Sequence, residues 1–95
     1  MNDNELIELR DLLDKVIDSS TKKEAQFPLR ELEYFVSLKR SSIFSLDPYL
    51  DEKIDQVIAY AKDASGRVAN KEHWVSCVEQ SWYVFENGIK NKRQK

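Results

Sequence analysis

The sequence predicts an all-α protein: a single domain over residues 1–95 that folds as an antiparallel four-helix bundle. Four segments carry apolar residues three and four positions apart, the spacing that lines one face of an α-helix. The chain holds only two glycines and two prolines, too few for the frequent turns of a β-sandwich or barrel. With 41% hydrophobic residues, four amphipathic helices joined by short connections can bury every apolar face in one core.

The first helix is predicted over residues 4–19. Asn2 followed three residues later by Glu5 fits a capping box, in which each side chain accepts a hydrogen bond from the other residue's backbone N–H. The helix should end near Ser19, where Ser19, Ser20 and Thr21 compete for backbone hydrogen bonds. Its seam is formed by Leu6, Leu9, Leu13 and Val16, broadened by Ile7, Leu12 and Ile17.

The second helix is predicted over residues 28–39. Pro28 suits the first helical position, because its missing N–H would have no partner there. The apolar face comprises Leu29, Leu32, Phe35 and Val36, with Tyr34 and Leu38 at its margins. We expect the segment after this helix to be an apolar connector beneath the bundle, formed by Ile43, Phe44 and Leu46.

The third helix is predicted over residues 48–65. Asp47 is a suitable N-cap, and Pro48 occupies the first helical position. Gly66 is the predicted terminator, since glycine adopts the left-handed conformation that closes many helices. The buried row comprises Leu50, Ile54, Val57, Ile58, Ala61 and Ala64.

The fourth helix is predicted over residues 70–89, with Asn70 as its cap and an end near Asn87 and Gly88. Residues 90–95 form a basic tail, which we interpret first as a solubilising helix C-terminus. We expect Trp74 and Tyr83 to flank the buried seam. That seam consists of Val75, Val78, Trp82, Phe85 and Ile89. The same spacing would also serve an intermolecular seam, so a helical hairpin dimer is an alternative arrangement.

The chemistry-bearing residues do not form a recognisable catalytic motif. His73 and Cys77 are the only histidine and cysteine, whereas a catalytic zinc site takes three protein ligands and a structural one four. Asp47, Asp51 and Asp55 recur at four-residue spacing, which we interpret as a solvated helix face. The sequence has no phosphate-binding glycine loop. We therefore predict a protein that is not an enzyme and has no metal site and no cofactor.

The charge is unevenly distributed along the chain. Residues 1–55 carry 13 acidic and 8 basic side chains, whereas residues 56–95 carry 4 acidic and 7 basic ones. The N-terminal residues lack the features of a secretory signal, and no apolar run is long enough to span a bilayer. We therefore expect a cytoplasmic protein that does not bind membranes.

Two tyrosines with carboxylates beside them are the candidate partner-binding residues. Tyrosine provides a large contact area at small entropic cost, and carboxylates steer basic partners. The alternative is that these rings simply cover the ends of the bundle. The predicted surface consists of Glu31 with Tyr34, and of Asp47, Tyr49, Asp51, Glu52 and Asp55.

In size, charge and inferred architecture, the chain resembles the small bacterial immunity proteins that block nuclease toxins, including the all-helical colicin D immunity type. The resemblance implies a non-enzymatic inhibitor whose carboxylates, such as Asp51, Glu52 and Asp55, mimic nucleic-acid phosphates in a basic cleft. The alternative function is a self-associating structural or regulatory protein, monomer and homodimer both being open. In that case the basic tail could contact nucleic acid, although we consider nucleic-acid binding the weaker interpretation.

Overall fold

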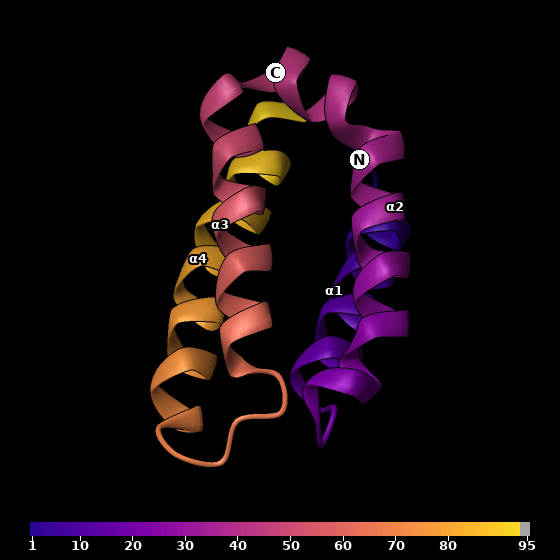
Figure 1. The fold of residues 1–95 in the computed structure, drawn as a ribbon. Coiled ribbons are helices and arrows are strands. Elements are labelled where there is room, and N and C mark those ends of the chain that lie inside the picture. The colour runs from indigo at the N-terminus through magenta and orange to yellow at the C-terminus, as the bar shows by residue number, and fades with distance from the viewer. Residues whose placement is uncertain (94–95) are drawn as a thin grey trace.

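The computed structural model describes residues 1–93 and shows an all-α fold, which confirms the predicted four-helix bundle. In the described residues the helices are α1 (Asp3–Ile17), α2 (Lys22–Leu46), α3 (Pro48–Ala64) and α4 (Lys71–Arg93). Figure 1 shows successive helices running antiparallel, so that both ends of the described chain lie at the same end of the bundle. Gln94 and Lys95, the last residues of the predicted tail, lie outside the described residues.

The predicted apolar seams meet in one core. The α1 seam is buried as expected, except that Ile7, predicted to broaden it, is exposed. Asn2 and Glu5 form the predicted capping box, with N–H to oxygen distances of 2.8 and 2.9 Å. The buried apolar residues contributed by α3 and α4 are Leu50, Ile54, Val57, Ile58, Ala61 and Ala64, and Val78, Trp82, Phe85 and Ile89.

The predicted start of the second helix is wrong by six residues. Thr21 is the N-cap: its hydroxyl accepts a hydrogen bond from the Glu24 N–H at 3.0 Å, and Glu24 in turn accepts one from the Ser20 N–H at 3.1 Å. Pro28 therefore lies inside α2, where it leaves the carbonyl of Glu24 without its helical donor. Glu24 is exposed, so water can solvate that carbonyl.

The predicted connector after the second helix is wrong as well. Ile43 and Leu46 belong to the last turns of α2, with Ile43 buried and Leu46 half-buried, while Phe44 is exposed. A single residue, Asp47, joins α2 to α3 and is both the C-cap of one helix and the N-cap of the next. The length of α2 matters for the site, because it places Arg40 on a regular helix beside α3.

Gly66 ends α3 as predicted, and it also joins the two helical hairpins. Its φ of +64° lies in the left-handed region, and its N–H donates to the Ser19 carbonyl at 3.1 Å. A Cβ at this position would lie 2.6 Å from the backbone nitrogen of Lys22. The link between α3 and α4 therefore packs directly on the link between α1 and α2, and only glycine fits between them.

The fourth helix begins directly after Asn70, the predicted cap, and ends later than predicted. Asn70 precedes it with a φ of +61°, and its backbone carbonyl accepts hydrogen bonds from the N–H groups of His73 and Trp74. At the other end, Gly88 is no terminator, because α4 continues to Arg93. A Cβ on Gly88 would collide with the Leu50 side chain, so the glycine permits the close packing of α4 on α3.

Candidate functional site

Five of the predicted partner-binding residues lie at the start of α3, four of them on the helix and Asp47 as its N-cap. The Asp47 carboxylate accepts a hydrogen bond from the Tyr49 N–H at 3.0 Å, which caps the helix. Lys92 of α4 brings its ammonium to 3.7 Å from the same carboxylate. Asp47 therefore stabilises the fold rather than projecting a free charge.

Arg40 holds the next two predicted carboxylates. Its guanidinium donates to Asp51 at 3.0 Å and to Asp55 at 2.7 and 3.2 Å, so that one cation bridges two turns of α3. The hydrogen bond and charge of Asp55 raise the pKa of Arg40, against the opposing effect of burial, with a further contribution from Asp51. Asp51 and Asp55 therefore form, together with Arg40, an ion-pair network that joins α2 to α3.

Two residues at the start of α3 are free of such a network in the described residues. Glu52 is exposed and makes no ion pair there. Tyr49 is 52% exposed, and the Lys53 ammonium lies 5.3 Å from the centre of its ring. With Gln56, these residues line a small surface hollow of 230 Å³. This part of the predicted surface remains accessible to a partner.

Glu31 and Tyr34 lie elsewhere, on the outer face of α2. Both are exposed, and Tyr34 is 67% exposed. The ion pair between Glu33 and Lys62 shows that this part of α2 lies beside the end of α3, whereas Arg40 lies beside its start. The structure therefore divides the predicted surface into two separate regions.

The outer face of α2 carries more apolar surface than the sequence prediction included. Phe27 is 70% exposed and Leu38 is 60% exposed, and both lie at helical spacing with Tyr34. Phe27 was missed because Pro28 was predicted to begin the helix. We call Phe27, Glu31, Tyr34 and Leu38 the α2 stripe.

Acidic residues on the outer face of α1 were also left out of the predicted site. Glu8, Asp11 and Asp18 are exposed and make no ion pair within residues 1–93, and the exposed Ile7 lies on the same helix. Lys15 is the one basic residue among the exposed side chains of α1. The signal was present in the sequence as polar positions between the seam residues.

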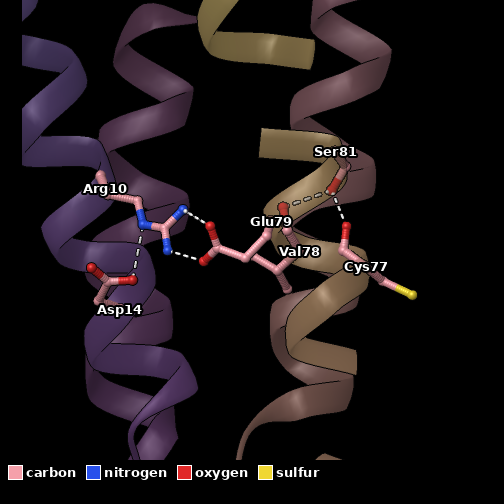
Figure 2. Close-up of polar contacts among 6 residues, drawn as sticks. All are labelled: Arg10, Asp14, Cys77, Val78, Glu79 and Ser81. Atoms are coloured by element: carbon pink, nitrogen blue, oxygen red, sulfur yellow. Dashed lines mark hydrogen bonds and ion pairs between the residues drawn. The ribbon is translucent and has the colours of Figure 1, made fainter. Parts of the chain in front are cut away.

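Arg10 links α1 to α4. Of all the helix pairs in the described bundle, the backbones of these two come into the least contact. Figure 2 shows its guanidinium reaching both carboxylate oxygens of Glu79, while its Nε donates to Asp14 at 2.9 Å. The same group lies 5.7 Å from the centre of the Trp82 ring. Arg10, Glu79 and Trp82 help to line a surface hollow of 770 Å³, which also includes Tyr83. Burial lowers the pKa of Arg10, but the hydrogen bonds and charges of Glu79 and Asp14 together outweigh it, so that the pKa is raised.

Figure 2 also shows that Ser81, which is buried, makes its side-chain hydrogen bonds within its own helix. Its hydroxyl donates within α4 to the carbonyls of Cys77 at 2.8 Å and of Val78 at 3.1 Å. Cys77 is half-buried, and its sulfur lies 3.9 Å from Nε2 of the exposed His73. Residues 1–93 contain no group of three metal-ligating side chains of the kind that could hold an ion.

The basic residues that end α4 are engaged within the fold. Lys90 lies 4.0 Å from Glu86, Lys92 pairs with Asp47, and Arg93 binds both the Asp3 carboxylate and the Met1 carbonyl. Asp3 gains a lowered pKa from the hydrogen bond and charge of Arg93. This end of α4 therefore has the role of a helix terminus anchored to α1 and α3.

Comparisons with known proteins do not identify a relative. No protein-family model, curated protein sequence or solved structure matches the chain. Within the described residues, no helix combines the length and apolar character needed to cross a membrane.

Proposed function

We propose that this protein acts by binding another protein, without chemistry of its own, and that the partner presents a basic surface. The observation that carries the proposal is the outer face of α1. There Glu8, Asp11 and the C-cap Asp18 are exposed with no ion-pair partner in residues 1–93, and Lys15 is the one exposed basic residue of α1 itself. Free carboxylates attract a basic partner over a distance that salt screening limits.

A neighbouring apolar group strengthens this surface as a binding site. Ile7 is exposed and lies one residue before Glu8. An interface gains affinity mainly from buried apolar anchors, while charges at its rim govern the rate and specificity of association. Ile7 would supply such an anchor, and the three carboxylates would supply the steering charge.

The more specific form of the proposal is an immunity or inhibitor protein for a nuclease-type toxin. A nuclease binds phosphates through basic residues, so a carboxylate surface can occupy the same cleft. The excess of acidic over basic residues in residues 1–55, 13 against 8, supports this form. Glu52 and Tyr49 at the start of α3 supply a second accessible contact.

The proposal is tested by charge reversal on α1. Immobilised wild-type protein and the variant Glu8→Lys/Asp11→Lys are exposed side by side to an extract of the native cells. Asp63→Lys/Glu72→Lys is the matched control, because it changes the net charge equally at residues of α3 and α4. We expect wild type and control to retain a basic protein that the α1 variant loses, with retention falling as salt rises from about 50 to 300 mM.

The recovered protein then decides the specific form of the proposal. If it is a nuclease, stoichiometric addition of this chain should block its activity, and the α1 variant should block it less. Equal retention by all three proteins would contradict a role for the α1 carboxylates. Recovery of acidic proteins alone would contradict the proposed basic partner.

A further inference from the structure

The α2 stripe presents three large exposed side chains, Phe27, Tyr34 and Leu38, and one carboxylate, Glu31, in a heptad pattern. Phe27, Glu31, Tyr34 and Leu38 are spaced by four, three and four residues, the repeat that forms the seam of a coiled coil. Glu24 precedes the stripe by three residues and Ser41 follows it by three, and both are exposed. The stripe lies on the face of α2 opposite Leu32, Val36 and Ile43, so the bundle's own core does not use it.

We propose that the α2 stripe binds a second copy of this chain in an antiparallel arrangement. A two-fold axis between residues 32 and 33 would bring Phe27 of one copy against Leu38 of the other. It would also bring Glu31 against Tyr34, whose hydroxyl can donate to the carboxylate. Because the pairing is isologous, each of these contacts occurs twice.

The pattern continues beyond the four central residues without conflict. In the same register Glu24 meets Ser41 of the other copy, so its carboxylate faces a hydroxyl donor. Lys23 and Arg30 flank the stripe and balance the charges of Glu24 and Glu31. Every layer from residue 24 to residue 41 therefore joins compatible side chains.

A parallel arrangement of two stripes is less favourable. It would place Glu31 against Glu31 of the other copy and oppose like charges. Self-complementarity in the antiparallel register, rather than exposure alone, is thus what identifies the occupant as a second copy.

The dimensions of the stripe predict a weak dimer. Residues 24–41 span about 27 Å of helix at ~1.5 Å per residue. One helix face of this length buries less than the roughly 800 Å² per partner of a standard interface. The dimer should therefore dissociate in the range of about 10 to 500 μM. The dimer uses a different face from the α1 carboxylates, so the two proposals, the dimer and the basic partner, are tested independently of each other.

Charge complementation tests both association and register. Phe27→Lys and Leu38→Glu each place a charge against an apolar residue in the homodimer, and each should weaken self-association at least tenfold. An equimolar mixture of the two variants pairs Lys with Glu at one layer and Leu38 with Phe27 at the other. The mixture should therefore recover association that neither variant shows alone, which a parallel arrangement would not allow.

The measurement is sedimentation velocity of the full chain from about 5 to 500 μM. The weight-average mass of wild type should rise from 11.2 kDa toward twice that value. Tyr83→Lys is the matched control, because Tyr83 is 69% exposed on α4, away from the stripe, and its substitution should change nothing. Both stripe positions are exposed, so circular dichroism should show unchanged helix content. A wild type that stays monomeric, a control that weakens association equally, or a mixture that recovers nothing would overturn the proposal.

Discussion

The start of α3 and the α2 stripe are both exposed surfaces with tyrosine and carboxylate side chains, yet the fold uses them differently. At the start of α3, Arg40 binds Asp51 and Asp55, and Lys92 approaches Asp47. Glu31, the one charged residue of the stripe, makes no ion pair within residues 1–93. The comparison teaches that a cluster of acidic residues in the sequence identifies a charged region but not whether those charges are already paired.

Substitution of a core residue should have the largest effect on the free energy of unfolding, and it is the reference for substitutions in both surface regions. Trp82 is buried beneath Arg10 and packs on Phe85 with ring centres 5.7 Å apart. Replacing it with Ala should lower the free energy of unfolding by about 3 to 5 kcal/mol, because a large cavity remains. Urea unfolding monitored by circular dichroism measures the change. A loss below about 1 kcal/mol would show that Trp82 does not belong to the core.

The next largest effect is expected at the start of α3. Arg40→Ala removes the cation that Asp51 and Asp55 share, and should lower the free energy of unfolding by about 1 to 2 kcal/mol. Arg30→Ala is the matched control, because Arg30 is exposed on the same helix without an ion pair in residues 1–93. The control should lie within about 0.5 kcal/mol of wild type. Equal free energies of unfolding for the two variants would show that Arg40 stabilises the fold no more than an unpaired arginine does.

The dependence of stability on acid pH extends the comparison to Glu5 on α1, whose carboxylate forms an ion pair with Lys39 of α2. Lys39 and the Asn2 N–H lower the pKa of Glu5 from its ordinary value of 4.5. Since the folded-state pKa lies below the unfolded one, Glu5 adds stability above pH 4.5, and this is lost as pH falls through the folded-state pKa.

Glu5→Gln should therefore cost about 0.5 to 1 kcal/mol at pH 7 and almost nothing near pH ~3. Glu31→Gln on the stripe is the control, because Glu31 makes no ion pair in residues 1–93, and it should change the free energy of unfolding of dilute protein by less than about 0.5 kcal/mol at pH 7. Urea unfolding at the two pH values measures both variants. A loss for Glu5→Gln that persists unchanged in acid would show that the ion pair between Glu5 and Lys39 is not its source.

The smallest effect on stability is expected at the stripe. Leu38→Ala should change the free energy of unfolding of dilute protein by less than about 0.5 kcal/mol, because the side chain is mostly exposed in the monomer. The same substitution should weaken association at high protein concentration. Chemical unfolding at low concentration and sedimentation at high concentration separate the two effects. A large destabilisation in dilute protein would place Leu38 in the fold rather than at an interface.

The apolar spacing was enough to predict the bundle, because burial of four amphipathic faces admits few solutions. The spacing also identified the buried apolar residues of α3 and α4, except that Val75, predicted in the seam of α4, is half-buried. The boundaries of α2 were missed for a local reason. Pro28 was predicted to begin a helix, whereas the Thr21 cap and the buried Ala25 extend the helix ahead of it.

The error at α2 also hid the internal role of the α3 carboxylates. A helix that ended at residue 39 would not have placed Arg40 opposite Asp51 and Asp55. The pairing of Arg10 with Glu79 joins residues 69 positions apart and depends on how α1 packs near α4. Such contacts follow from tertiary packing, which helical periodicity alone does not specify. The stripe was missed in part because Phe27 fell outside the predicted helix.

Hydroxyl-radical footprinting of Tyr34 and Tyr49 compares the two regions most directly. Their exposed fractions are similar, 67% and 52%, so both rings should be oxidised at comparable rates in dilute protein. In concentrated protein the account predicts that Tyr34 becomes protected while Tyr49 keeps its rate. Protection of Tyr49 instead, or no protection of Tyr34 at any concentration, would contradict the division of roles between the two surfaces.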